Sequence, residues 1–288
     1  MGTARALRGL AGSCHPGPTL AVTVLVTVLA AASGRDAAGC VLVFAAVLTG
    51  QLSIGWCNDA VDAGRDAAAG RTDKPVVAGV VSATAVRDAA VVALALCVPL
   101  SLASGVVAGL VHLVGVGAAW AYDLGMKATR LSWLPYAVGF GALPAFVTLG
   151  LPGGPWPSWW VVLAAALLGV GAHLANVLPD IASDLAAGVR GWPQRLGRAR
   201  VSALVPLPLL AATALLAFGS YGAAPAAWVA LAAAGATTAA GLTAGLTAGL
   251  TAGLPAAGRW PKAPFVAAIA VAGIDVALLV ANGARLTA

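Results

Sequence analysis

Aspartate side chains gather in two short groups of this 288-residue chain. The first group reads Asn58-Asp59-Ala-Val-Asp62-Ala-Gly-Arg65-Asp66, and the second reads Asn176-Val-Leu-Pro-Asp180-Ile-Ala-Ser-Asp184. On a helix, spacings of three and four residues place the acids of each group on one face. Such crowded carboxylates repel one another and need a cation, and Mg²⁺ binds a few carboxylates together with the phosphates of a substrate. The candidate metal ligands are Asn58, Asp59, Asp62, Asp66, Asp180 and Asp184.

Basic side chains accompany both groups of acids. They are Arg65, Arg71 and Lys74 near the first group, Arg190 and Arg195 after the second, and Lys127 between the two. Cations of this kind pair strongly with phosphate oxygens. The two acid groups, a bridging metal ion and a basic rim would therefore clamp a diphosphate. The alternative is a solvated acidic loop with no chemistry.

The composition shows which elements must position these residues. Hydrophobic residues make up 60% of the chain and charged residues 9%, against roughly 25% charged residues in an ordinary soluble domain. A soluble globule of this size cannot cover its surface with so few charges, and a disordered chain would carry many more. The chain is therefore predicted to be a polytopic membrane protein.

Nine apolar segments approach the length of about 20 residues that a membrane-spanning helix needs. They cover roughly residues 18–34, 38–57, 86–103, 105–125, 133–151, 158–180, 200–219, 224–253 and 264–284. Short turns rich in Gly and Pro separate them. We predict an all-α fold, with nine transmembrane helices in one bundle and a single membrane-embedded domain over residues 1–288.

The basic residues also predict the orientation of the chain. With nine spans, 14 of the 16 Lys and Arg residues fall on one side of the membrane, and only Arg35 and Arg285 fall on the other. The positive-inside rule makes the first side cytoplasmic. We therefore expect a multi-pass cell-membrane protein with a cytoplasmic N-terminus and a C-terminus on the opposite side. Both acid groups end even-numbered spans, so they face the cytoplasm together, which favours the clamp. The net charge of +6 follows from this topology, and no nucleic-acid partner is expected.

At these residues the sequence resembles a known family, the UbiA-type intramembrane prenyltransferases. The first group resembles the family signature NDxxDxxxD, and Asp180-x-x-x-Asp184 resembles its second motif, DxxxD. The stretch Arg71-Thr-Asp-Lys74-Pro75 is similar to the family's R-x-x-R-P, with Lys74 where Arg is usual. Tyr122-Asp-Leu-Gly-Met-Lys127 resembles a Tyr…Lys element at the end of the fourth helix.

This resemblance implies a nine-helix bundle whose active site opens at the cytoplasmic side. It implies Mg²⁺-dependent transfer of a prenyl group from a prenyl diphosphate to an acceptor, with release of diphosphate. The acceptor would be an aromatic quinone precursor or another membrane-accessible molecule of a lipid pathway. The implied catalytic residues are Asp62, Asp66, Asp180 and Asp184. The implied diphosphate-binding residues are Asn58, Arg71, Lys74, Tyr122 and Lys127.

Aromatic side chains near the acid groups have two interpretations. Trp56, Trp120 and Tyr136 are candidates to stabilise the allylic cation that forms when diphosphate leaves, or they anchor the helices at the membrane interface.

Isolated polar residues of the spans are also ambiguous. His173 either orients or deprotonates an acceptor hydroxyl, or it makes a hydrogen bond between helices, and we favour the hydrogen bond. Asp275 is either a functional or a structural intramembrane acid. We assign no role to His15.

Two other functions fit the same residues. A terpene cyclase of the same superfamily would use the same clamp and let the cation close on its own tail. A cation-coupled membrane transporter is the alternative from a different class. Its ion site would be expected near the midplane of the membrane, whereas both acid groups are predicted at one face.

Overall fold

The computed structural model of the protein describes residues 3–219, 225–250, 262–281 and 286–287, and this part of the chain contains helices and no β-strand. Arg259 and Arg285, which entered the charge count, lie outside the described residues. The α-helices are α1 (Thr3–Ser13), α2 (Pro16–Ala32), α3 (Ala37–Ala68), α4 (Ala83–Ala103), α5 (Val106–Asp123), α6 (Leu134–Leu149), α7 (Trp159–Val177), α8 (Ile181–Ala186), α9 (Trp192–Leu196), α10 (Arg198–Leu204), α11 (Pro206–Phe218), α12 (Pro225–Leu250) and α13 (Ala263–Ala281). Two 3₁₀ turns, η1 (Met126–Ala128) and η2 (Leu178–Asp180), follow α5 and α7.

The helices begin where the sequence supplies caps. Asp36 accepts a hydrogen bond from the backbone N–H of Gly39 at 2.8 Å and starts α3, and Ser82 accepts one from Ala85 at 3.1 Å and starts α4. Proline in the first turn starts α2, α6 and α11, where its missing N–H leaves no hydrogen bond unmade. Short polar or proline-containing connections thus divide an otherwise apolar chain into separate helices.

Seven of these helical stretches are long and apolar enough to cross a membrane. They are α3, α4, α5, α7 with its continuation through η2 and α8, α10 with α11, α12 up to Thr247, and α13. The first predicted span falls on α2, which passes the same test only together with α1, and the fifth falls on α6, which has 16 residues. The fold therefore indicates a multi-pass membrane protein, while the number nine stays a prediction.

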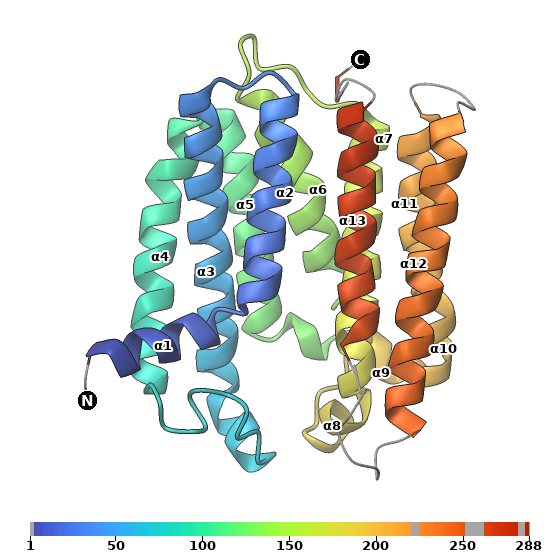
Figure 1. The fold of residues 1–288 in the computed structure, drawn as a ribbon. Coiled ribbons are helices and arrows are strands. Elements are labelled where there is room, and N and C mark those ends of the chain that lie inside the picture. The colour runs from blue at the N-terminus through green and yellow to red at the C-terminus, as the bar shows by residue number, and fades with distance from the viewer. Residues whose placement is uncertain (1–2, 220–224, 251–261, 282–285, 288) are drawn as a thin grey trace.

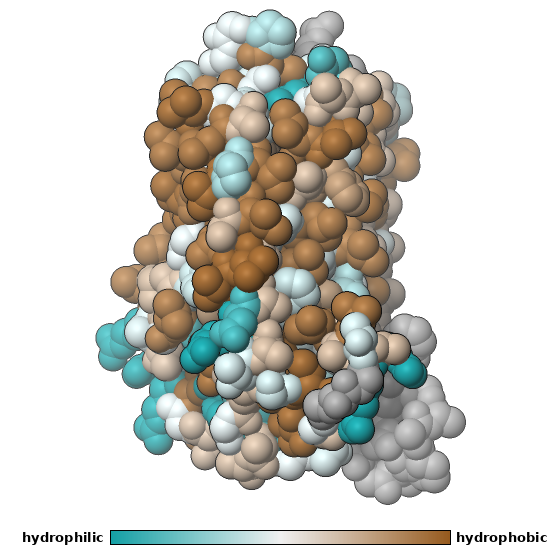
Figure 2. Space-filling model, turned by 90° about the vertical axis from the view of Figure 1, so that its left-hand side faces the viewer, coloured by the Kyte–Doolittle hydropathy of each residue, from teal (hydrophilic) through white to brown (hydrophobic). Residues whose placement is uncertain are grey.

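The outer surface agrees with a lipid environment. Large apolar side chains such as Leu20, Val41, Val92 and Val229 point outward and are about half exposed or more. On the face shown in Figure 2, hydrophobic residues cover most of the height of the bundle, and hydrophilic residues gather towards one end. A contiguous apolar belt of this size is typical of a surface that contacts lipid.

A sharp elbow separates α1 from α2. The two helices meet at 67°, so that α1 lies across the end of the bundle in Figure 1. His15 forms the elbow in the left-handed region, with φ of 54° and ψ of 64°. The elbow packs so closely on α3 that a Cβ at Gly55 would lie 2.5 Å from the carbonyl oxygen of Cys14. Trp56 of α3 also donates its indole N–H to the carbonyl of Leu10 at 2.8 Å.

The ends of α3, α5 and α7 that carry the predicted site residues lie at the same end of the bundle as α1 and α8 (Figure 1). Leu286 lies at the opposite end, where its carbonyl accepts a hydrogen bond from the N–H of Ser158 at 2.7 Å. The fold therefore brings the two acid groups together from distant parts of the sequence.

Candidate active site

One cavity of about 450 Å³ runs into the bundle from the end that carries the acid groups. Side chains of α2, α3, α5, α6, α7 and α13 form its walls. Charged and amide groups surround its mouth, whereas mostly apolar residues such as Val22, Leu143, Val161 and Leu279 line its interior. The buried Asp275, an ambiguous intramembrane acid in the sequence, also lines the cavity, as does His112. The cavity thus has a polar end suited to an anion and an apolar end suited to a hydrocarbon chain.

Asp62 is the most strongly paired acid at the mouth. Lys127 donates from Nζ to its Oδ1 at 2.5 Å, and Nη2 of Arg65 lies 2.6 Å from its Oδ2. Asp62 and Lys127 are 65 residues apart in the sequence, and both side chains are only about a tenth exposed. Tertiary packing therefore adds the nearly buried Lys127 to a local pair that Asp62 makes with Arg65, which is 30% exposed and one turn further along α3.

Asn58 lies one helical turn before Asp62 on α3. Its amide nitrogen donates to Oδ1 of Asp123 at 2.9 Å, which leaves the amide oxygen of Asn58 free to bind a metal ion or a donor. The other carboxyl oxygen of Asp123 is buried and has no hydrogen-bond partner among the described residues. Both side chains line the cavity, so the mouth has unused oxygen ligands.

Asp59 points away from the cavity, unlike the other members of its group, and does not line it. It is 2% exposed, and its Oδ1 accepts from Nζ of Lys74 at 2.5 Å and lies 3.1 Å from Nε2 of His15. Nζ of Lys74 also lies 4.0 Å from Asp66, which does line the cavity. The position of Asp59 fits an anchor for Lys74 and His15 better than the metal ligand that the sequence predicted.

The second acid group lies across the mouth, where the helix breaks. Pro179 lies in η2 between α7 and α8, and the chain turns so that Asp180 and Asp184 both line the cavity. Gln194 holds Asp184 by donating from Nε2 to Oδ2 at 2.8 Å. Asp180 makes no side-chain hydrogen bond or ion pair within the described chain, so it is available to a ligand.

Lys127 is held in place by the segment that follows α8. The chain leaves α5 through Gly125, whose φ of 150° favours glycine, and η1 then turns Lys127 into the cavity. Gly191 packs against the carbonyl oxygen of Lys127 too closely to admit a Cβ. The N–H of Trp192 also donates to Oγ of Ser132 at 3.1 Å. The turn that carries Lys127 and the segment after α8 therefore support each other.

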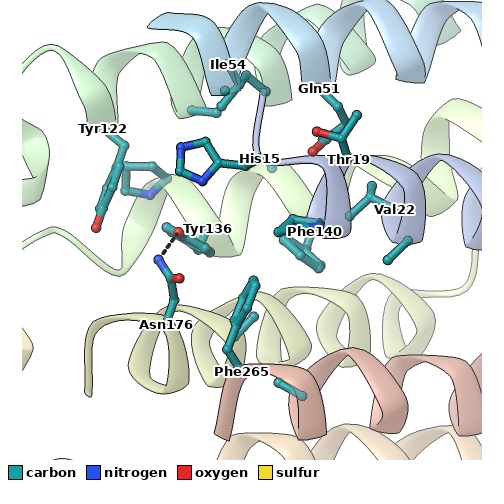
Figure 3. A pocket seen from close by; sticks show the side chains of 18 of the residues that line it. His15, Thr19, Val22, Gln51, Ile54, Tyr122, Tyr136, Phe140, Asn176 and Phe265 are labelled. Atoms are coloured by element: carbon teal, nitrogen blue, oxygen red, sulfur yellow. Dashed lines mark hydrogen bonds between the residues drawn. The ribbon is translucent and has the colours of Figure 1, made fainter. Parts of the chain in front are cut away.

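Aromatic rings of α5 and α6 line part of the cavity wall (Figure 3). Tyr122 meets Tyr136 edge to face with ring centroids 5.2 Å apart, and Tyr136 stacks on Phe140 at 6.4 Å. Asn176 fixes Tyr136 by donating to its hydroxyl oxygen at 3.3 Å. Among the predicted aromatic candidates only Tyr136 lines the cavity, because the indole of Trp56 faces α1 and that of Trp120 donates to Ser53.

Arg71 and Asp73 form an ion pair on the exposed rim. Two guanidinium nitrogens donate to the carboxylate at 3.0 and 3.2 Å, and these hydrogen bonds hold the pKa of Asp73 below its usual value. Arg71 still lines the cavity, so it lies beside the mouth while the exposed Asp73 partly neutralises its charge.

The structure brings together most of the residues predicted from the sequence. One cavity is lined by Asn58, Asp62, Asp66, Arg71, Lys74, Tyr122, Lys127, Asp180 and Asp184. Arg190 and Arg195, predicted as part of the basic rim, do not line it. His173 is 1% exposed, does not line the cavity and hydrogen-bonds Ser132 at 3.2 Å, so its contact is structural, although Ser132 lies in the turn before α6 and not in a helix.

Sequence reasoning missed several side chains of the cavity. Asn176 stands one helical turn before Asp180, a signal that could have identified it. His15 and Gln194 had no comparable signal, because their positions depend on the elbow and on the segment after α8. Within the described residues no three His, Cys, Asp or Glu side chains come close enough to hold a metal ion by themselves.

The model of the UbiA prenyltransferase family matches residues 19–252 of this chain. The chain belongs to the UbiA prenyltransferase family. No curated protein matches it by sequence. The resemblance seen in the two aspartate motifs is thereby confirmed for most of the chain.

Solved structures with the UbiA fold cover this chain almost completely. The apo structure of a UbiA homologue from Aeropyrum pernix is 23% identical, with a TM-score of 0.68 over 92% of this chain and 98% of that one. A homologue from Archaeoglobus fulgidus bound to GPP and Mg²⁺ is 16% identical, with a TM-score of 0.65 over 96% and 99%. A digeranylgeranylglyceryl phosphate synthase is 15% identical, with a TM-score of 0.64 over 98% and 99%. At these identities the likeness establishes the fold of this UbiA-family chain.

Proposed function

We propose that this chain transfers the prenyl group of a prenyl diphosphate to a membrane-accessible acceptor substrate and releases diphosphate, with Mg²⁺ as cofactor. One observation carries the proposal: acids from α3 and from η2 and α8 lie with Arg65, Arg71, Lys74 and Lys127 at the mouth of a cavity whose interior is mostly apolar. Family membership supports it, as do the Archaeoglobus fulgidus homologues bound to Mg²⁺ with GPP or DMAPP.

The side chains at the mouth fit Mg²⁺. They offer carboxylate and amide oxygens, the ligands that this ion prefers, from Asn58, Asp62, Asp66, Asp180 and Asp184. The ion usually takes one or two carboxylates and completes its shell with water and substrate phosphates, so these side chains could hold it together with a bound diphosphate. When bound, Mg²⁺ would neutralise the charge that develops on the departing diphosphate.

The basic residues would bind the diphosphate directly. Lys127 and Lys74 now neutralise Asp62 and Asp59, and Arg71 neutralises Asp73. Phosphate oxygens accept the same charge-assisted hydrogen bonds that these cations now donate to carboxylates. The cations can therefore exchange a carboxylate partner for phosphate without a change in their positions in the fold.

The apolar part of the cavity would hold the hydrocarbon tail. Its walls exclude water from the reacting end of the prenyl group, which protects an allylic cation until the acceptor substrate attacks. The rings of Tyr122, Tyr136 and Phe140 lie between the charged mouth and the apolar interior, where their faces would stabilise that cation.

The charge distribution further leads us to propose that the mouth faces the cytoplasm, with the N-terminus on the same side and the C-terminus outside. Protease removal of a terminal tag in right-side-out and inverted vesicles tests this orientation. Cleavage of an N-terminal tag only in inverted vesicles supports it, and the reverse result contradicts it.

The activity is tested by incubating purified protein with Mg²⁺ and prenyl diphosphates of several lengths, with membrane extract as the source of acceptors. Pyrophosphate release and prenylated products are followed by mass spectrometry. We expect Asp62→Ala and Asp180→Ala to abolish turnover while the proteins still insert into the membrane. Asp88→Ala is the matched control, because Asp88 is exposed on α4 and pairs only with its neighbour Arg87.

Wild-type turnover in both cavity variants would refute the proposed site. Metal-dependent ion flux through liposomes without any prenyl turnover would favour the transporter. Cyclised hydrocarbon products without an acceptor would favour the cyclase.

A further inference from the structure

The elbow between α1 and α2 holds His15 in an unusual backbone conformation. Among the described residues it is the only non-glycine with positive φ. Thr19 fixes this turn by donating from its hydroxyl to the carbonyl of Cys14 at 2.7 Å and from its N–H to that of His15 at 3.2 Å. Strained backbone of this kind persists only where surrounding contacts impose it, and it concentrates at functional sites.

The His15 ring is also fixed from its far side. Its Nε2 lies 3.1 Å from Oδ1 of Asp59, a side chain that is 2% exposed. Because an ionised carboxylate only accepts hydrogen bonds, Nε2 carries the hydrogen of this contact. In the neutral ring Nδ1 then has a free lone pair, and it has no partner within the described part of the chain.

The ring lies at the boundary between the two parts of the cavity. The side chain is 38% exposed and lines the cavity, where Figure 3 shows it among Tyr122, Ile54 and Thr19. Asp59 and Lys74 connect it to Asp66 at the charged mouth. A hydroxyl bound by His15 would therefore lie beside the diphosphate end of the donor, with the rest of its molecule in apolar surroundings.

We propose that His15 binds the hydroxyl group of the acceptor substrate, whose O–H donates to Nδ1, and thereby selects an amphiphilic alcohol or phenol. This assignment rests on the proposed function for the identity of the two substrates. It makes His15 a specificity-determining residue. Asp59 is then a positioning residue that fixes which ring nitrogen is free.

Two probes that differ only in the hydroxyl test this proposal. 4-Butylphenol and 4-butylanisole have the same apolar body, but the anisole has no O–H to donate. Their affinities are measured by calorimetry on the full-length protein in nanodiscs, with and without Mg²⁺ and a non-reactive geranyl thiodiphosphate. Binding of the thiodiphosphate itself is measured separately, so a failure of the donor site is recognised independently.

The matched variant is His15→Gly, because glycine accepts the positive φ and removes the ring without straining the elbow. His15→Asn is the conservative variant, since asparagine also tolerates this conformation and keeps an oxygen acceptor. Asp88→Asn on the exposed surface is the control.

We expect the wild-type protein to bind the phenol about two- to tenfold more tightly than the anisole, as one hydrogen bond to a partly exposed ring predicts. His15→Gly should abolish this preference and leave the affinity for Mg²⁺ and the thiodiphosphate within about threefold, while His15→Asn should restore part of it. Equal binding of both probes by the wild-type protein, or a preference that survives in His15→Gly, would overturn the proposal. The phenol and anisole affinities are also measured without the thiodiphosphate, so this outcome can be read even if the donor site fails to bind it.

Discussion

Replacing Lys127 by Met tests whether this side chain serves the ligand or only the fold. Methionine keeps most of the length and apolar contacts of lysine while removing the charge. Asp62 would lose Lys127 at 2.5 Å but retain Arg65 at 2.6 Å, so the variant does not leave a bare buried charge. A bare buried charge destabilises a protein by about 3–5 kcal/mol, and with Arg65 retained we expect a loss of about 1–2 kcal/mol.

The effect on the donor should be larger. A hydrogen bond between a charged side chain and phosphate contributes about 1.5–3 kcal/mol, so the Kd for geranyl diphosphate with Mg²⁺ should rise about 10- to 150-fold. Calorimetry on the purified protein measures this change, and thermal unfolding without ligand measures the effect on the fold.

Asp62→Asn is the comparison, because it deprives both Lys127 and Arg65 of their carboxylate. It should lower the unfolding temperature more than Lys127→Met. If Lys127→Met changes donor affinity by less than about threefold, or destabilises the protein more than Asp62→Asn, Lys127 is structural and the phosphate assignment fails.

Three further substitutions test the packing and charge around the site. Gly55→Ala inserts a Cβ at 2.5 Å from the elbow backbone, so we expect about 1–3 kcal/mol of destabilisation, read as a lower unfolding temperature; an unchanged temperature would contradict the close contact. Gly191→Ala displaces the turn that carries Lys127, so the Kd for the prenyl diphosphate should rise and the unfolding temperature without Mg²⁺ should fall. Unaltered binding would show that this turn adapts to the added methyl group. Asp73→Asn releases Arg71, which should tighten donor binding by no more than about fivefold. Arg71 lowers the pKa of Asp73, so the wild-type ion pair persists at neutral pH and weakens as pH falls through that lowered pKa. The difference in donor affinity between Asp73→Asn and the wild-type protein should therefore become smaller when it is measured at acid pH.

The helices and the acid groups were predictable because both depend on local spacing. Runs of about 20 apolar residues predict helices wherever lipid surrounds the chain, and the predicted segments fall on helices of the structure. Acids three and four residues apart share a face of any helix, so Asp62 with Asp66, and Asp180 with Asp184, were expected to act together. Spacing on one helix could not separate Asp59 from its neighbours, since only the packing of the elbow and Lys74 against it turns it from the cavity.

Tertiary structure decided which distant side chains pair with the acids of the site. The contact between Lys127 and Asp62 joins residues 65 positions apart, and that between His15 and Asp59 joins residues 44 positions apart. A helical period cannot encode either contact, because each depends on how two helices pack and on the turn that connects them. The sequence alone therefore determined a membrane-embedded helical protein of this family with two acid groups. Only the packed bundle decided that Lys127 meets Asp62 and that His15 meets Asp59 and reaches the cavity, because those contacts depend on the elbow at His15 and on the close approach of Gly191 to Lys127.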